Sequence, residues 1–264
     1  MMRGIRCVRT LLALLVALAL CASDPSVAQE RTDFGRFVDW VGGDAKALVQ
    51  SVDARDAAYV AGGAAVLIPL SRFDERINPE IQESYRGNLA RFLDFTNELG
   101  SPKVVAPLVA VFGASLLTDD TKLQDAAFTS MQSLLYAGLV TYGLKYTVGR
   151  MRPYEGNGSN RFLPLSGHNS FPSGHTTVAF AIVTPWVVYY PHPVTYGLFA
   201  LSAGTAVARL AHNAHWATDV AAGAAIGTVT GYWLTKRHQG LQRGASLTPT
   251  AGPDALGFTL NVTF

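Results

Sequence analysis

The chain has 264 residues, of which 49% are apolar and 15% are charged, and its formal net charge is +2. Soluble globular proteins usually carry about 25% charged residues, so this composition favours a membrane protein or a membrane-associated bundle. The small net charge and the scattered lysines and arginines exclude a nucleic-acid-binding surface, and we expect no nucleic acid partner.

Residues 1–28 have the layout of a secretory signal peptide. Three arginines precede an apolar run at 11–22, and small residues allow cleavage after Ala28. An uncleaved anchor helix is one alternative. A lipoprotein signal at Cys21 is another, although the bulky residue before this cysteine argues against it. Both cysteines of the chain lie in this segment, so the mature chain would have none to form a disulfide.

The next 200 residues predict an all-α bundle of about six apolar helices. Apolar segments alternate with polar connections, and they are rich in Ala and Leu and too long for strands. The segments are 57–70, 104–117, 126–144, 176–190, 194–210 and 217–234. Residues 34–52 and 77–102 predict amphipathic surface helices. In the last segment, Gly223, Gly227 and Gly231 form a smooth face against which a neighbouring helix can pack closely.

The C-terminal tail predicts a short β-hairpin. From Leu256 to Phe264 apolar residues alternate with Gly, Thr and Asn, which is the periodicity of a strand, and residues 251–254 predict a turn. The expected organisation is therefore a signal peptide at 1–28, a helical domain at 29–237 and a tail at 238–264.

Three polar clusters stand at the ends of apolar segments. They are KYTVGRMRP at 145–153, PSGH at 172–175 and ARLAHNAHWATD at 208–219. If successive helices alternate in direction, all three clusters lie at one end of the bundle, where Lys145, Arg152 and Arg209 meet two histidines. Converging cations need a counter-charge, and a tetrahedral oxyanion can accept hydrogen bonds from all of them. The pattern predicts a phosphate site.

The helix that follows PSGH adds donors to this site. A proline such as Pro172 is tolerated at a helix start, and Ser173 is a natural cap. Gly174 lets an anion approach the backbone, while the first-turn amides and the helix dipole favour negative charge. We therefore expect Ser173 and Gly174 to bind phosphate.

The third cluster supplies a catalytic pair. His215 and Asp219 are four residues apart and share one face of a helix. A carboxylate bonded to one ring nitrogen leaves the other as a nucleophile. We expect His215 to attack phosphorus, and His175 to protonate the leaving oxygen and then deprotonate water. The three cations would neutralise the transition state, so the chemistry needs no metal ion or other cofactor.

Three other histidines have alternative interpretations. His212 and His215 are three residues apart and, with Asp219, could imitate a zinc site, but the nearby cations would repel a metal ion. His168 is expected in a loop near the pocket mouth, and His238 is expected to be exposed.

These spacings resemble the three-part signature of the type 2 phosphatidic acid phosphatase and vanadium-dependent haloperoxidase superfamily. Its parts are Lys145, six residues, Arg152-Pro153; Pro172-Ser173-Gly174-His175; and Arg209, five residues, His215, three residues, Asp219. The resemblance spans about residues 126–234 and implies a helical phosphatase with a phosphohistidine at His215. The chain departs from the signature at Ala208, where the family usually has a serine.

Two classes of function follow. The first is a phosphatase for phosphomonoesters or pyrophosphates, with phosphorylated lipids as expected substrates and a soluble periplasmic acid phosphatase as a near variant. The second is a vanadium-dependent haloperoxidase. The resemblance argues against it, because the haloperoxidases of this superfamily are much longer chains with additional helical bundles.

The predicted segments also bear on location. They have about 14 to 19 residues, against about 20 for a membrane span. If all six crossed the membrane, the site would face the cytoplasm. We favour an extracytoplasmic, periplasmic site in a membrane-associated or membrane-embedded protein. This location follows if the first segment does not cross the membrane. It also follows if the bundle is a largely periplasmic domain whose apolar helices cover one another.

Overall fold

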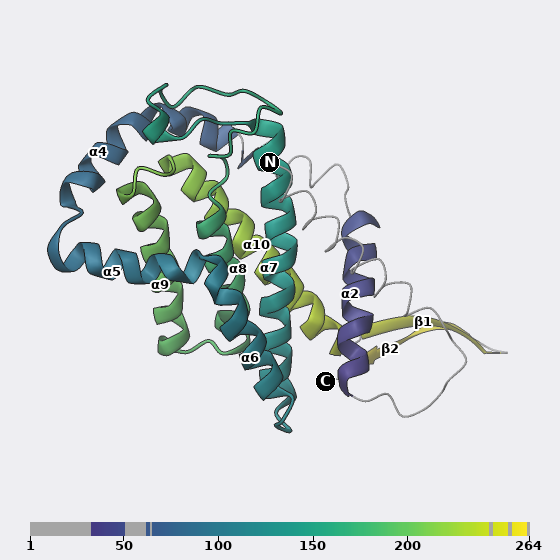
Figure 1. Ribbon diagram of the computed structural model, residues 1–264. Helices are drawn as coiled ribbons and strands as arrows, with labels where there is room; N and C mark the ends of the chain where they lie inside the picture. The colour runs from purple at the N-terminus through teal and green to yellow at the C-terminus, as the bar shows by residue number, and fades with distance from the viewer. Residues whose placement is uncertain (1–32, 51–61, 64, 243–244, 253–254, 263–264) are drawn as a thin grey trace. The chain divides into compact units, whose positions relative to one another are not determined.

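The computed structural model describes residues 33–50, 62–63, 65–242, 245–252 and 255–262 (Figure 1). They belong to two units, which divide between Gly62 and Gly63. The predicted signal peptide lies outside the described residues. In the first unit, helix α2 (Asp33–Gln50) covers the predicted amphipathic segment.

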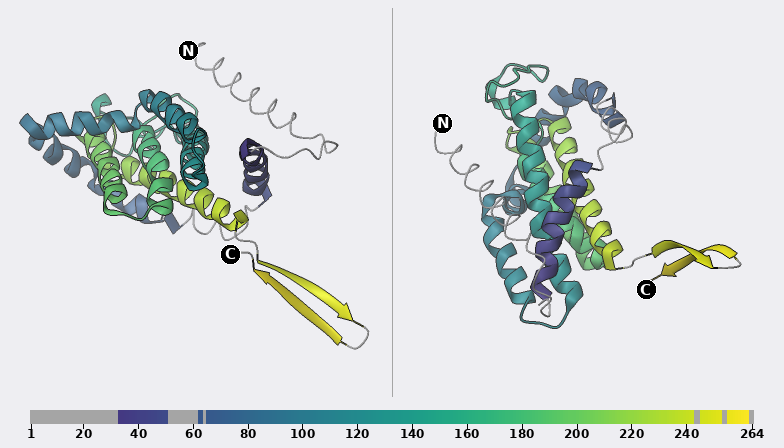
Figure 2. Two further views of the ribbon diagram at one scale, coloured as in Figure 1. Left: turned by 90° about the horizontal axis from the view of Figure 1, so that it is seen from below. Right: turned by 90° about the vertical axis from the view of Figure 1, so that its right-hand side faces the viewer.

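The second unit is built around helices α7 (Thr121–Val148), α8 (Gly174–Tyr189), α9 (Pro193–Ala211) and α10 (Ala217–Gln242). They run side by side, and α8 contacts the other three (Figures 1 and 2). α7 is longer than the predicted segment at both ends. It begins where the Asp120 side chain accepts a hydrogen bond from the Leu123 amide at 3.0 Å, and it ends at Gly149, whose φ of 58° is left-handed.

Three shorter helices cover this group. α4 (Asp74–Ser84) and α5 (Gly87–Asn97) confirm the helices predicted within 77–102, and α6 (Val105–Ser115) lies within the second apolar segment. α5 packs on α9, and α6 packs on α7. Short 3₁₀ turns flank them: η1 (Ser71–Phe73) precedes α4, and η2 (Glu98–Gly100) and η3 (Pro102–Val104) lie between α5 and α6. Of the predicted segment 57–70, the described residues 62–63 and 65–70 are helical.

The helices α7 to α10 alternate in direction. α7 and α9 therefore end where α8 and α10 begin, at the upper end of the bundle in Figure 1. The three polar clusters lie at this end, as the sequence predicts.

Glycines allow α10 to pack closely on α8. A Cβ atom added at Gly223 would lie 2.6 Å from the Ser173 carbonyl oxygen, and one at Gly227 would lie 2.8 Å from the Ala181 amide nitrogen. These distances are shorter than van der Waals contact, so no other residue fits without displacing α8. The predicted smooth face of α10 is confirmed.

The tail forms the predicted hairpin. Strands β1 (Ala245–Gly252) and β2 (Ala255–Val262) pair antiparallel, with Ala245 opposite Val262 and Gly252 opposite Ala255. The residues between the strands, 253–254, are outside the description.

Within the described residues, α9 is the one helix long and apolar enough to cross a membrane, and 33% of its apolar window is buried inside the protein. Large apolar side chains are also exposed on other helices. Examples are Phe95 on α5, Val109 on α6 and Val229 on α10, which are 68%, 50% and 66% exposed. Exposed apolar side chains on several helices are consistent with an apolar surrounding.

We expect Gly227→Ala to destabilise the protein by about 1–3 kcal/mol, because the new methyl group would overlap the backbone of α8. Gly240→Ala is the matched control, since it lies on the same helix with nothing within 4 Å of its added Cβ. Thermal unfolding of both purified variants measures the difference. Equal unfolding temperatures would contradict the close packing of α8 and α10.

Candidate active site

His215 and Asp219 lie together at the start of α10. Both are buried, and the distance from His215 Nδ1 to Asp219 Oδ2 is 3.7 Å. Among the described residues, Nδ1 has no hydrogen-bond partner. The backbone of His215 is fixed by Asn78 of α4, whose Nδ2 donates to the His215 carbonyl at 2.9 Å. A ring movement of under about 1 Å would complete an Nδ1–H to Oδ2 bond and leave Nε2 for other chemistry.

The Asp219 carboxylate is held on both oxygens. Oδ1 accepts from Arg150 Nη1 at 2.6 Å, and Oδ2 accepts from the Trp216 amide at 2.9 Å and from the Ser170 hydroxyl. Burial opposes ionisation, but the His215 ring and the Arg150 guanidinium favour it, and the pKa of Asp219 is lowered. Asp219 is therefore ionised at neutral pH.

His215 is neutral at neutral pH. Burial lowers its pKa to about 4, because the imidazolium would lose its hydration. Asp219 raises the pKa, while Lys145 and Arg152 lower it. The ring therefore keeps a lone pair at one nitrogen, as a nucleophile requires.

Three cations come from three different segments. Lys145 is in the last turn of α7, Arg209 is in the last turn of α9, and Arg152 precedes η4 (Pro153–Glu155). Asn169 holds two of them: its carbonyl accepts from Lys145 Nζ, and its Oδ1 accepts from Arg152 Nε at 2.9 Å. Arg209 Nη1 donates to Asn97 Oδ1 at 3.2 Å.

Lys145 and Arg152 share Asn169, and the three cations lie close enough for their charges to affect one another. Burial lowers the pKa of Lys145 to about 8, and the charges of Arg152 and Arg209 also lower it. Arg209 Nε is buried and has no hydrogen-bond partner among the described residues. An unpartnered donor within a group of like charges is a place for an anion.

His175 belongs to the same group. It is the second residue of α8, and burial lowers its pKa to about 4, with further lowering by Arg209 and Arg152. Gly100 of η2 lies directly against its backbone, because an added Cβ would overlap the His175 carbonyl. The charges of the cations thus act on His175 as well as on His215.

The start of α8 differs from the expectation in one respect. The Ser173 amide donates to the Asp219 carbonyl at 2.9 Å, so this amide is not available to a phosphate, and the Ser173 side chain makes no capping hydrogen bond. Its hydroxyl accepts from Thr176 Oγ1 at 3.0 Å. The amides of Gly174 and His175 open the helix without intrahelical acceptors and remain candidates for an anion.

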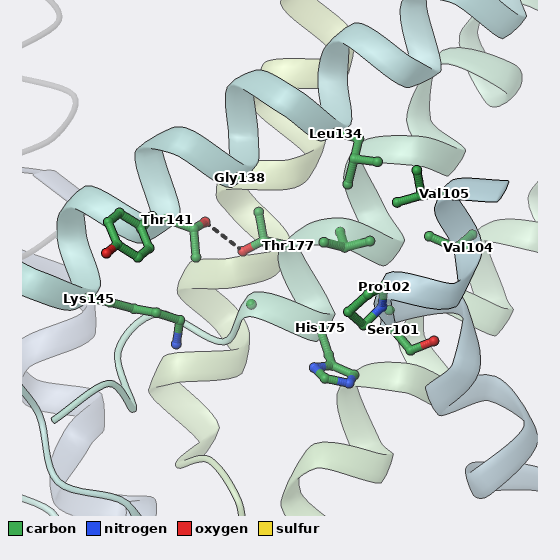
Figure 3. A pocket seen from close by; sticks show the side chains of 14 residues that line it. Ser101, Pro102, Val104, Val105, Leu134, Gly138, Thr141, Lys145, His175 and Thr177 are labelled. Atoms are coloured by element: carbon green, nitrogen blue, oxygen red, sulfur yellow. Dashed lines mark hydrogen bonds between the residues drawn. The ribbon is translucent and has the colours of Figure 1, made fainter. Parts of the chain in front are cut away.

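An apolar pocket of about 290 Å³ adjoins this group. Figure 3 shows Lys145 and His175 at one end of it and Leu134, Val104 and Val105 at the other. The walls come from η3, α6, α7 and α8. A ligand with a charged end and an apolar body fits this shape.

His212 does not pair with His215. Its Nε2 lies 2.8 Å from Asp94 Oδ1 and 3.0 Å from the Tyr85 hydroxyl. Across the described part of the chain, no three His, Cys, Asp or Glu side chains are grouped to hold a metal ion.

The other two histidines also have partners. His168 lies in the loop before α8, with Nδ1 3.0 Å from Glu155 Oε1. The expectation that His238 is exposed is wrong, because it is fully buried with Nδ1 2.8 Å from Thr129 Oγ1.

Several residues in and around the site were not predicted from the sequence. They are Asp74, Asn78, Asn97, Arg150, Asn169 and Ser170. Arg150 could have been found, because it lies in the same cluster as Arg152. Asp74, Asn78 and Asn97 come from segments without a recognisable motif, so only the fold reveals them.

A sequence profile of the PAP2 superfamily matches residues 126–243. A lipid A 1-phosphatase of Porphyromonas gingivalis is 37% identical over 108 residues, which are 38% of this chain and 22% of that protein. Lipid A 1-phosphatases of Rhizobium johnstonii and Rhizobium etli are each 33% identical over 100 residues, 36% of this chain and 41% and 43% of their lengths. The chain thus spans less than half of each of these relatives.

Two solved structures share the fold. The crystal structure of Aquifex aeolicus LpxE is 23% identical, with a TM-score of 0.50 over 62% of this chain and 95% of that one. A transmembrane PAP2 type phosphatidylglycerolphosphate phosphatase from Bacillus subtilis is 17% identical, with a TM-score of 0.51 over 68% and 95%. The matched profile covers residues 126–243, which are less than half of the chain, and the two solved structures show the same helical fold.

Proposed function

We propose that the chain is a phosphatase that hydrolyses phosphomonoesters or pyrophosphates of lipids through a phosphohistidine at His215, without a metal ion. The observation that carries the proposal is the group of cations around His175 and His215, beside an apolar pocket, where Arg209 Nε has no hydrogen-bond partner among the described residues.

The phosphate group binds to the converged cations. Lys145, Arg152 and Arg209 donate to its non-bridging oxygens, and the first amides of α8 add backbone donors. Its negative charge relieves the repulsion among the cations, so binding is favoured before any reaction.

His215 then attacks phosphorus. Its Nε2 lone pair forms the P–N bond while the P–O bond to the leaving group breaks, and Asp219 accepts the Nδ1–H bond as positive charge develops on the ring. The cations stabilise the charge on the equatorial oxygens.

His175 moves the protons. In the ligand-free protein its low pKa keeps it neutral at pH 7. A bound phosphate dianion beside it raises that pKa, so the ring carries a proton to the departing oxygen. It then takes a proton from the water that hydrolyses the phosphohistidine.

The lipid assignment is supported by the apolar pocket and by the names of the lipid A 1-phosphatase relatives. A hydrocarbon chain in the pocket would lie directly beside the phosphate. The exposed apolar side chains support membrane association. Cleavage of residues 1–28 would place the helical domain, 29–237, and the tail, 238–264, on the periplasmic side.

The overall test is release of phosphate by purified protein from a panel of lipid phosphates, with lipid A 1-phosphate among them, beside a soluble aryl phosphate. We expect the lipids to be preferred. A preference for the aryl ester would favour the soluble acid phosphatase instead.

We expect His215→Ala and His175→Ala each to reduce phosphate release by about 1000-fold or more, because each removes a reacting group. His192→Ala is the control, since His192 caps α9 away from the site. EDTA should leave the wild-type rate unchanged. Loss of activity with EDTA that zinc restores would contradict the proposal.

We expect kcat/KM to fall as pH rises through about 8, because Lys145 loses its proton there and the phosphate loses a cation. Below about 4 the rate should fall again as His215 becomes protonated. Lys145→Arg is the matched variant. Because arginine stays charged, whatever activity this variant retains should lack the fall near pH 8.

We expect Gly138→Leu to raise the KM for a long-chain lipid phosphate about 10-fold, because its side chain would fill the pocket. Hydrolysis of a short soluble ester should be unchanged. The control is Gly143→Leu. Gly143 lies on the same helix but outside the pocket lining, and a Cβ atom added at Gly143 or at Gly138 has no described atom within 4 Å. Equal KM values for both variants would show that the pocket does not hold the lipid.

A further inference from the structure

Arg150 is a buried cation that the proposed reaction does not use. It follows the C-terminal glycine of α7, and it is 1% exposed. Arg152, two residues later, contacts the phosphate site, whereas Arg150 turns into the protein between two carboxylates, those of Asp74 and Asp219.

All five N–H donors of Arg150 are engaged. Nε and Nη2 donate to the Ser159 carbonyl at 2.9 and 2.7 Å, and Nη2 also donates to Asp74 Oδ2 at 2.7 Å. Nη1 donates to Thr218 Oγ1 at 2.8 Å and to Asp219 Oδ1 at 2.6 Å. A lysine has three donors and no planar fork, so it cannot reproduce this set.

Asp74 completes the frame from the other side. It is the first residue of α4 and is fully buried. Its Oδ1 accepts from the Thr218 amide at 2.9 Å, and its Oδ2 accepts from the Thr218 hydroxyl at 2.6 Å. The start of α10, which carries Asp219, is therefore tied to α4 and to Arg150 at once.

This frame fixes one oxygen of Asp219, while the Trp216 amide and the Ser170 hydroxyl hold the other, which faces His215. Because Arg150 occupies Oδ1, the carboxylate cannot rotate freely, and Oδ2 is the atom 3.7 Å from His215 Nδ1. A carboxylate fixed in this way selects the Nδ1–H tautomer and so leaves Nε2 as the nucleophile.

We propose that Arg150, held by Asp74, is a positioning residue that orients the Asp219 carboxylate toward the nucleophilic histidine. The proposal rests on the proposed phosphatase function, in which His215 is the nucleophile. Arg150 acts through Asp219 and does not touch the phosphate.

The first test is the kinetics of Arg150→Lys and Asp74→Asn. We expect kcat to fall about 10- to 100-fold in each, with KM for the same lipid phosphate within about twofold, because the substrate contacts are intact. Arg161→Lys is the control, since Arg161 is an exposed residue of the following loop. Each rate is divided by the fraction of the protein that is folded at the assay temperature, which thermal unfolding measures. If kcat of the folded variants stays within about twofold of wild type, the proposal fails.

The second test is a double-mutant cycle. If Arg150 acts through Asp219, then Arg150→Lys should cost less than about twofold in the Asp219→Asn background. A merely structural role would give the same fold-loss in both backgrounds, and that result would overturn the proposal.

The third test does not depend on activity. In protein labelled with ¹⁵N-histidine, we expect His215, assigned by its loss in His215→Gln, to be the Nδ1–H tautomer in wild type and a mixture of tautomers in Asp74→Asn. An unchanged tautomer would overturn the inference, even if Arg150→Lys does not fold. If wild-type protein releases no phosphate but the tautomer shifts, then the proposed function fails and the positioning role stands.

Discussion

Like charges held close together repel, and this repulsion governs the chemistry of the site. Lys145, Arg152 and Arg209 come from the ends of separate segments and meet where water is partly excluded. Burial first, and the charges of the neighbouring cations after it, lower the pKa of Lys145 to about 8 and those of both histidines to about 4. Without a ligand the site therefore holds an excess of positive charge, which an anion would relieve.

Two carboxylates beside these three cations are bound to a fourth cation. The carboxylates of Asp74 and Asp219 are both buried, and both are paired with Arg150. Removing one partner of such a buried network is costly, because it leaves a charge without compensation. The arrangement gives two neighbouring zones, one of cations that suits an anion and one that holds the Asp219 carboxylate beside His215.

The sequence predicted the parts of the site that belong to compact motifs. Helix-end clusters and an alternating helix direction were enough to bring Lys145, His175 and His215 together, and the four-residue glycine spacing predicted the close packing of α10. These inferences work because helix periodicity and polarity are local properties.

Other features could not be read from the sequence. His238 looked like an exposed residue near a helix end, but the helix continues to Gln242 and the ring pairs with Thr129. The Ser173 amide looked available, but the close approach of α10 brings the Asp219 carbonyl to it. Asp74 and Asn78 reach the site from α4, about 140 residues away from their partners. Each of these outcomes depends on tertiary contacts rather than on local pattern.

One asparagine in the loop before α8 contacts two of the three cations. Asn169 offers its carbonyl to Lys145 and its side-chain oxygen to Arg152, so one neutral amide residue occupies donors on two of the three cations. A lysine has three N–H donors and an arginine has five, so Asn169 leaves further donors on both cations. The loop from Gly167 to Ser170 therefore orients these two cations in the ligand-free protein and leaves part of their hydrogen-bonding capacity for an anion.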